Sequence, residues 1–366
     1  MSQTTTNLAA SLPSEDPSND FLTRACENGW FPDWLVRAGM RKLMAQRLVD
    51  EGHRDGEFCA SRLASLIDEL SASPIAIETD AANAQHYELP PSFFAAHLGP
   101  HLKYSCCLYA DSGTTLAQAE EAMLALYERR AALADGQRIL DLGCGWGSLS
   151  LWLAARYPSA EIVALSNSHG QRAFIETQAA IRKLGNLRVL NGNVANFSAD
   201  PLVDGGRFDR IVSIEMFEHM KNYRALLARI AGWLEPDGKL FVHHFAHRTL
   251  AYHFEVHDRS DWMSKYFFTG GTMPSESLLL HFQDDLTVKR HWWLNGTHYE
   301  RTANDWLARL DAARSQIMPV LKETYGAVDA SRWFQRWRMF YMAVAELFGF
   351  AQGNEWGVAH YLLEKR

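Results

Sequence analysis

The sequence predicts an α/β fold in which a mostly parallel sheet is covered by helices on both faces. Beyond Asp135, short runs rich in β-branched residues alternate with stretches whose apolar residues recur every three or four positions. This alternation is typical of parallel strands joined by helices. The expected strands are residues 138–143, 161–166, 187–192, 208–215 and 238–245, and the helices between them are residues 148–158, 170–185 and 223–236.

The N-terminal part of the chain has a different pattern. Residues 1–20 are polar and lack the basic start and apolar centre of a secretory signal, so we expect a disordered N-terminus and a cytoplasmic protein. Over residues 21–80 the apolar positions recur at helical spacing, which predicts an N-terminal helical region of two or three helices. A polar stretch with a Pro pair follows and resets the pattern. We therefore expect one larger domain over residues 81–366.

An aromatic-rich insertion follows the fifth expected strand. Residues 249–280 are predicted to form a helical lid over the carboxyl edge of the sheet, where it would roof an acceptor pocket. About half of its rings are expected to pack in the core instead; they include Tyr252, Phe254, Trp262, Tyr266, Phe267 and Phe268. Strands are then expected within residues 281–296 and 355–366, with helices over residues 306–317 and 333–350 between them.

Composition and charge exclude several classes of function. The formal net charge is −7 and basic residues occur singly or in pairs, which argues against nucleic acid as a partner. No window reaches the ~18 apolar residues of a membrane span, so we expect no integral membrane segment. The five cysteines include no CxxC pair, and the His-rich stretch at residues 243–257 lacks a third ligand at suitable spacing. We therefore expect no metal site.

The stretch DLGCGWG at residues 141–147 ends the first expected strand and opens a helix. Its glycines Gly143, Gly145 and Gly147 permit positive φ and close approach of a ligand to the backbone. The free N–H groups of the following helix favour a negatively charged ligand. The spacing differs from the G-x-G-x-x-G dinucleotide pattern and from the G-K-[ST] phosphate loop. A purely structural turn can also use such glycines, so the loop alone leaves both interpretations open.

Several motifs together resemble one family. DLGCGWG, the later strand ends and FDRIVS resemble the motifs of S-adenosylmethionine-dependent methyltransferases with a Rossmann-like fold. HYELPPSFF, LGPHLKYSCCLY, MFEHMKNY and FFTGGTMPS are similar, more narrowly, to the cyclopropane fatty acid synthase family, and most of all to its coclaurine N-methyltransferase branch. The resemblance implies a class I methyltransferase domain with a seven-stranded sheet whose last strand is antiparallel. It also implies S-adenosylmethionine as cofactor, with S-adenosylhomocysteine as product.

The resemblance implies a set of cofactor-binding residues along the strand ends. They are Tyr104, Ser105, Asp141, Gly143, Gly145, Ser166, Asn167, Gln171, Asn193 and Val194. The first two would cap the amino-acid end of the cofactor, the three that follow the second strand would hold the ribose hydroxyls, and the last two would lie at the adenine. Methyltransferases more often place an acidic residue at the ribose, whereas Ser or Thr with a following Gln is typical of the synthase family. The departure therefore supports the narrower resemblance.

The stretch IEMFEHMKNY at residues 214–223 carries the ionisable groups expected to do the chemistry. Glu215, Glu218 and His219 follow a strand end and can reach the open edge of the sheet. Burying three such groups costs stability unless they have a function, although a solvated acidic turn is the simpler alternative. The resemblance implies that Glu218 and His219 hold an acceptor ammonium and take its proton, with Glu215 helping to place the cofactor or the amine.

The same family implies a rival chemistry. Its synthases methylate an unsaturated lipid chain and hold a bicarbonate, whose site would consist here of Cys106, Glu218, His243, Tyr299 and the backbone near Phe245. Synthases commonly have Gly at the position of Glu215, which favours the amine branch. We therefore expect N-methylation of a small amine, with cyclopropane formation on an unsaturated phospholipid as the alternative and a non-catalytic cofactor-binding protein as the least favoured interpretation. A homodimer is possible.

Overall fold

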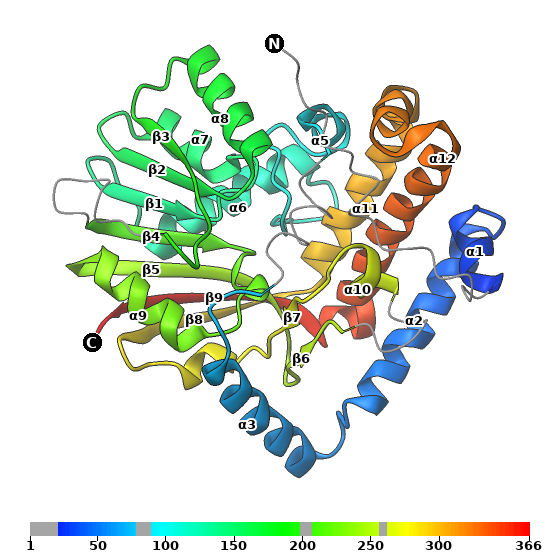
Figure 1. The fold of residues 1–366 in the computed structure, drawn as a ribbon, viewed down its shortest axis with the longest axis horizontal. Coiled ribbons are helices and arrows are strands. Elements are labelled where there is room, and N and C mark those ends of the chain that lie inside the picture. The colour runs from blue at the N-terminus through cyan, green and yellow to red at the C-terminus, as the bar shows by residue number, and fades with distance from the viewer. Residues whose placement is uncertain (1–20, 78–88, 198–206, 256–261) are drawn as a thin grey trace.

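The computed structural model describes residues 21–77, 89–197, 207–255 and 262–366, and a seven-stranded sheet with strand order β3-β2-β1-β4-β5-β9-β8 forms its centre (Figure 1). The strands of this sheet are β1 (Arg138–Leu142), β2 (Glu161–Ser166), β3 (Leu187–Asn191), β4 (Phe208–Ile214), β5 (Leu234–His247), β8 (Leu286–Asn295) and β9 (Trp356–Lys365). All neighbours pair in parallel except β9, which is antiparallel to both β5 and β8. The predicted mostly parallel sheet with an antiparallel last strand is confirmed. Because the strand order reverses beside β1, a ligand site is expected at the carboxyl ends of β1 and β4.

Helices cover both faces of the sheet, as predicted, because consecutive strand residues point to opposite sides. Ile139 belongs to a core shared with α6, α7, α11 and α12, whereas Leu140 belongs to a second core shared with α3 and α9. The helices are α1 (Phe21–Glu27), α2 (Asp33–Asp50), α3 (Gly56–Ala72), α5 (Pro91–His97), α6 (Leu116–Ala131), α7 (Ser148–Arg156), α8 (His169–Arg182), α9 (Tyr223–Trp233), α10 (Trp262–Tyr266), α11 (Thr297–Ala312) and α12 (Arg314–Gly349). Short 3-10 turns are η2 (Phe217–His219), η3 (Leu278–His281) and η4 (Phe350–Gly353).

Several helix boundaries differ from the sequence prediction. The last two helices, α11 and α12, begin well before the predicted residues 306 and 333. α12 contains Pro319 and changes direction at Gly326, whose φ is 85° and not helical, and these two residues obscure the helical pattern. The predicted helix over residues 223–236 ends at Trp233, because Leu234 already pairs with Phe208 as the start of β5.

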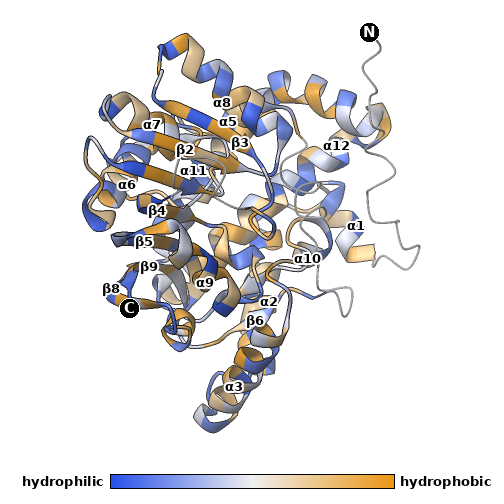
Figure 2. Cartoon of the chain, turned by 60° about the vertical axis from the view of Figure 1, so that its left-hand side comes forward, coloured by the Kyte–Doolittle hydropathy of each residue, from blue (hydrophilic) through white to orange (hydrophobic). Residues whose placement is uncertain are grey.

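The N-terminal helices pack against the rest of the chain and run along one side of it (Figure 1). α1 and α2 lie on α12, where the buried Arg336 donates two hydrogen bonds to Glu27, at 3.0 and 2.9 Å, and Arg338 pairs with Asp33 at 2.7 Å. α3 contacts α9 and carries hydrophilic and hydrophobic residues along its length (Figure 2). The predicted disordered start lies outside the described residues. The domain boundary near residue 80 does so as well, and both stay predictions.

The lid prediction falls between β5 and β8. Besides the short helix α10, this segment contains a two-stranded ladder of β6 (Tyr252–His253) and β7 (Thr272–Met273), paired antiparallel. Over the described ranges, none of the helices combines the length and apolar character needed to cross a membrane. Homodimerisation stays a prediction.

Candidate active site

The glycine loop after β1 has the conformation that its sequence predicts. Gly143, Gly145 and Gly147 all have positive φ, at 87°, 52° and 77°. A Cβ atom at Gly143 would lie 2.8 Å from the side chain of Met216, and one at Gly147 would lie 2.7 Å from that of Ile175. Both positions therefore require glycine for their backbone angle and for the space around them.

A first pocket lies at the carboxyl ends of the strands, over this loop. All ten residues predicted to bind the cofactor line it: Tyr104, Ser105, Asp141, Gly143, Gly145, Ser166, Asn167, Gln171, Asn193 and Val194. They come from the loop before α6, from the ends of β1, β2 and β3 and the segments that follow them, and from the first turn of α8. The fold thus brings every one of them to a single site, although the contact that each makes with a cofactor stays a prediction.

The polar groups of the first pocket suit a nucleoside with an amino-acid tail. Trp146 Nε1, Ser148 Oγ and Gln171 Nε2 are buried, line this pocket and have no hydrogen-bond partner within the described chain. Buried polar atoms without partners are costly, so such donors indicate a polar ligand. Ser166 donates to Gln171 Oε1 at 2.7 Å, which leaves the Gln171 amide hydrogens to face a ligand. Burial raises the pKa of Asp141 to about 6, partly offset by hydrogen bonds from Ser150.

A second pocket adjoins the first. Tyr104, Glu215 and His219 line both pockets, so they mark the junction between them. The remaining lining of the second pocket is apolar apart from Tyr299 and comes from β5, the lid, α11 and α12: Phe245, Phe254, Met263, Phe268, Met273, Tyr299, Trp306, Phe340, Val344, Leu347 and Phe348. Of the lid rings named in the sequence, Phe254 and Phe268 line this pocket. Two of the predicted lid rings thus face this pocket, and the role of the segment as a lid over an acceptor stays a prediction.

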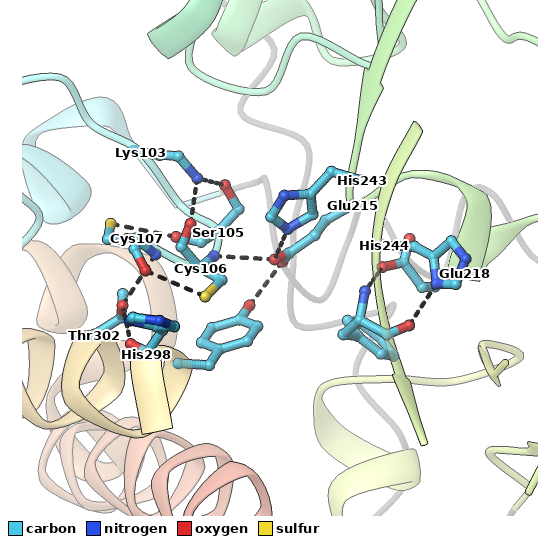
Figure 3. Close-up of polar contacts among 12 residues, drawn as sticks. Lys103, Ser105, Cys106, Cys107, Glu215, Glu218, His243, His244, His298 and Thr302 are labelled. Carbon is cyan, nitrogen blue, oxygen red and sulfur yellow. Dashed lines mark hydrogen bonds and ion pairs between the residues drawn. The ribbon is translucent and has the colours of Figure 1, made fainter. Parts of the chain in front are cut away.

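The Glu215 carboxylate is the centre of a hydrogen-bond network at this junction (Figure 3). Its Oε1 atom accepts from the backbone N–H of Cys106 at 3.0 Å and lies 3.1 Å from His243 Nε2. Its Oε2 atom accepts from the Tyr299 hydroxyl at 2.7 Å. Glu215 also has a φ of 48°, and residues held in this sparsely populated region often have a function.

Burial dominates the protonation of this site. It raises the pKa of Glu215, while Lys103, the hydrogen bonds from Cys106 and Tyr299, and His219 lower it in part. Burial lowers the pKa of His219 to about 4, although the nearby Glu215 charge opposes this shift. His219 is therefore neutral near pH 7 and can accept or donate a hydrogen bond.

Glu218 lies apart from these groups. It is fully buried and lines neither the first nor the second pocket. Its Oε1 atom accepts from the backbone N–H of Phe245 at 2.8 Å, whereas its Oε2 atom has no partner among the described residues. Burial and the neighbouring Glu215 charge raise its pKa well above the usual value. The predicted role of Glu218 in taking a proton from the acceptor stays a prediction.

Sequence reasoning missed Lys103, which is only 2 % exposed and lines the first pocket. Its ammonium donates to Ser105 Oγ at 2.5 Å and to the Cys106 carbonyl at 2.6 Å (Figure 3). A lysine inside the otherwise uncharged motif LKYSCC was the available signal. It was missed because lysine is rarely buried.

The structure does bring histidines together, but not in a form suited to a metal. Ligand atoms of His53, His247 and Glu355 lie within 4.8 Å of one another. However, His247 Nδ1 accepts from the backbone N–H groups of Thr249, at 3.0 Å, and Leu250, at 2.9 Å. The ring proton therefore lies on Nε2, 3.4 Å from the Glu355 carboxylate, where a metal would need a lone pair. His257, the last residue of the His-rich stretch, lies outside the described residues.

Comparisons with known proteins agree with this geometry. The family described as "Mycolic acid cyclopropane synthetase" matches residues 76–352. The (S)-coclaurine N-methyltransferase of Thalictrum flavum subsp. glaucum is 40% identical over 94% of this chain and 95% of its own length. The cyclopropane-fatty-acyl-phospholipid synthase of Escherichia coli K12 is 29% identical over 66% of this chain and 59% of its own length.

A solved structure extends the comparison. A crystal structure of coclaurine N-methyltransferase bound to N-methylheliamine and S-adenosylhomocysteine has a TM-score of 0.90 and 38% identity, and it covers 94% of this chain and 99% of the other. The first pocket, with its unpartnered polar groups, fits the cofactor of this family. The chain therefore belongs to the mycolic acid cyclopropane synthetase family and is an S-adenosylmethionine-dependent methyltransferase with a class I fold.

Proposed function

We propose that the protein methylates the nitrogen of a small aromatic amine, and the position of the Glu215 carboxylate carries this proposal. The Cys106 N–H group and the Tyr299 hydroxyl donate hydrogen bonds to this carboxylate, and His243 Nε2 lies within hydrogen-bond distance of it. These are three of the positions that the family resemblance implies for bicarbonate in the lipid-modifying synthases. In this chain they hold a carboxylate that belongs to the protein itself.

The chemistry of an amine acceptor explains why a fixed carboxylate is useful. S-adenosylmethionine supplies an electrophilic methyl group on a positively charged sulfur. An amine can accept this group only when its nitrogen is unprotonated, so a base has to take the ammonium proton. Glu215 lies at the junction of the two pockets and can bind the ammonium and receive that proton. Neutral His219 lines the same junction and can share the hydrogen bonding.

The second pocket suits an aromatic amine. Its walls include Phe254, Phe268 and Phe348, and the faces of such rings attract a protonated or methylated amine. An apolar pocket with one carboxylate at its end binds an aromatic body and a cationic nitrogen at the same time. The relatives support a coclaurine-like acceptor, since one of them is named (S)-coclaurine N-methyltransferase and the related crystal structure holds N-methylheliamine.

The alternative is cyclopropane formation on an unsaturated phospholipid. Identity to the Escherichia coli synthase and the presence of Cys106, Glu218, His243 and Tyr299 favour it. The Glu215 side chain argues against it, because a bicarbonate would compete with that carboxylate for the same donors and would be repelled by its charge. The amine is therefore the better-supported acceptor.

The acceptor can be tested by product analysis. The protein is incubated with S-adenosylmethionine and either coclaurine or vesicles of unsaturated phosphatidylethanolamine, and mass spectrometry locates the added carbon. We expect S-adenosylhomocysteine release and a methylated nitrogen with coclaurine, and no modified acyl chain with the vesicles. Turnover confined to the vesicles would refute the proposed function.

A further inference from the structure

Paired positions on neighbouring strands connect Glu215 to the far edge of the sheet. His243 on β5 lies opposite His360 on β9, and His360 lies opposite Trp292 on the edge strand β8. Arg130 from α6 stacks over the Trp292 ring, with its guanidinium carbon 4.7 Å from the ring centroid. Glu215, His243, His360 and Arg130 therefore form a row. It begins at the junction of the two pockets and ends at the half-buried guanidinium of Arg130.

Hydrogen-bonding atoms join the members of this row. Arg130 Nη1 lies 2.7 Å from His360 Nδ1, and His360 Nε2 lies 2.9 Å from His243 Nδ1. His243 Nε2 lies 3.1 Å from Glu215 Oε1. A guanidinium has donors but no acceptor, so His360 Nδ1 has to accept, and the His360 proton lies on Nε2. His243 Nδ1 then accepts as well, which places the His243 proton on Nε2, toward Glu215.

A hydroxyl also lies beside the same nitrogen. The Tyr127 hydroxyl lies 2.9 Å from His243 Nδ1. A hydroxyl can donate or accept, so Tyr127 is compatible with either tautomer of His243. The chain that begins at Arg130 is therefore the one that sets the tautomer.

Because these groups are buried, the tautomer of His243 affects the ionisation of Glu215. His243 and His360 have no exposed surface, and burial lowers the pKa of both well below the usual value, so the two rings are neutral. Burial lowers the pKa of Arg130 to about 10, so it stays a cation near pH 7. In the opposite tautomer, His243 would direct a lone pair at the Glu215 carboxylate, which disfavours the ionised form of that group.

We propose that Arg130 and His360 are positioning residues for methyl transfer, which fix the Nε2–H tautomer of His243 and thereby keep the Glu215 carboxylate ionised and oriented. The inference rests on the proposed function for the role of Glu215 as proton acceptor. Neither Arg130 nor His360 lines either pocket, so both act on the reaction through His243.

Other charged or titratable groups also face these residues, and apart from Arg130 itself none of those groups changes in Arg130→Met. Those around Glu215 are Lys103, Cys106, Glu218, His219, His243 and Tyr299. Those around His360 are Lys103, Tyr127, Arg130, His243 and His244. A change at Arg130 alone therefore isolates the contribution of the hydrogen-bond chain from Arg130 through His360 to His243.

The direct test is the tautomer of His243 in the full-length protein without any acceptor. Two-bond ¹H–¹⁵N NMR spectra of protein labelled with ¹⁵N-histidine distinguish the two tautomers, and the His243→Gln variant assigns the signal. We expect the Nε2–H tautomer of His243 from about pH 6 to pH 9, and a shift of the population toward Nδ1–H in Arg130→Met. An Nδ1–H tautomer in the wild-type protein, or no change in Arg130→Met, would overturn the proposal.

The pH profile of kcat at saturating amine gives a second readout that a purely structural role would not change. Loss of the chain from Arg130 through His360 to His243 should raise the pKa of Glu215. The acid limb is the pH range in which kcat falls as the pH is lowered. We expect Arg130→Met and His360→Leu to move this limb upward by about half to one pH unit. We expect kcat on the alkaline plateau to stay within about threefold, because Glu215 is ionised there. His360→Gln should restore the wild-type limb, since its amide can accept from Arg130 and donate to His243.

Arg129 on the same helix offers a matched control, because it is exposed and outside the row. Arg129→Gln should leave the profile unchanged, and calorimetry should show cofactor affinity within about twofold for all variants, as neither Arg130 nor His360 lines the cofactor site. An equal loss of kcat at every pH would refute the positioning role. Should His360→Leu fail to fold, Arg130→Met still decides the question. Absence of amine turnover would refute the proposed function, whereas the tautomer measurement would still decide this inference.

Discussion

The Tyr299 hydroxyl donates a hydrogen bond to Glu215 Oε2 at 2.7 Å and joins the first turn of α11 to the residue directly after β4. Both side chains line the second pocket, so this bond lies on the surface that an acceptor would contact. Together with the Cys106 N–H group, it leaves the carboxylate with a defined orientation toward the junction.

Replacement of the two acidic residues should separate their roles. Glu215→Gln removes the proton acceptor at the junction, so we expect kcat to fall by about 10²- to 10⁴-fold while the cofactor still binds. Glu218→Gln can keep the hydrogen bond from the Phe245 N–H and should lower kcat by only about tenfold. Turnover and isothermal titration with S-adenosylhomocysteine measure the two effects. A larger loss of kcat in Glu218→Gln would return the role of base to Glu218, as the sequence predicted.

The pH dependence of kcat should follow Glu215 and not His219. Burial raises the pKa of Glu215 above its ordinary value, and the ionised form is the active one. Activity should therefore be lost as the pH falls through this raised pKa, above the ~4.3 of a free glutamate. His219, with a pKa of about 4, is already neutral near pH 7. His219→Asn should lower kcat without moving the acid limb, and a limb that disappears with His219 would contradict the assignment.

Replacement of the neighbouring rings Phe267 and Phe268 by alanine should affect stability and substrate binding differently. Phe268 lines the second pocket, so Phe268→Ala should raise the KM for the amine by about tenfold with little change in the free energy of unfolding. Phe267 is fully buried and stacks on Phe340 at 4.5 Å between ring centroids. Phe267→Ala should therefore destabilise the protein by about 3 to 5 kcal/mol. Urea unfolding and initial rates with coclaurine provide the comparison, and equal effects on KM would show that Phe268 is not a pocket wall.

Gly136 and Gly147 have similar backbone angles but different surroundings. Alanine at these two positions therefore distinguishes backbone strain from a steric clash of the added Cβ atom. Gly147 has a φ of 77° and a Cβ there would lie 2.7 Å from Ile175, whereas Gly136 has a φ of 80° with no atom within 4 Å. Alanine at either position should cost about 1 to 3 kcal/mol of stability through backbone strain. Only Gly147→Ala should also weaken cofactor binding by more than about tenfold, because it displaces the loop that lines the first pocket. Equal cofactor affinity in both variants would contradict this account of the loop.

The lining of the first pocket could be predicted from the sequence because its residues lie near the strand ends in chain order. Gly143 follows β1, Ser166 ends β2 and Asn193 comes shortly after β3, and the carboxyl ends of parallel strands meet at one edge of the sheet. The partners of Glu215 were harder to foresee. The resemblance implied Tyr299 and His243 as bicarbonate ligands, and only the fold shows that they bind or approach the carboxylate of Glu215 instead.

The wall of the second pocket could not be predicted in detail, for a different reason. Val344 and Leu347 lie on α12, whose apolar residues have the same pattern whether they face a core or a ligand. The direction of α12 depends on the kink at Gly326 and on packing against α11, and neither can be derived from local periodicity. The burial of Lys103 likewise depends on tertiary contacts with Ser105 and Cys106.

The central claim is that Glu215 replaces bicarbonate as the base, and bicarbonate dependence tests it most directly. Methylation of coclaurine is measured in carbonate-free buffer and again with added bicarbonate, for the wild-type protein and for Glu215→Gly. We expect the wild-type rate to be the same within about twofold in both buffers, and the low rate of Glu215→Gly to rise when bicarbonate can occupy the vacated donors. A wild-type rate that requires bicarbonate would contradict the account.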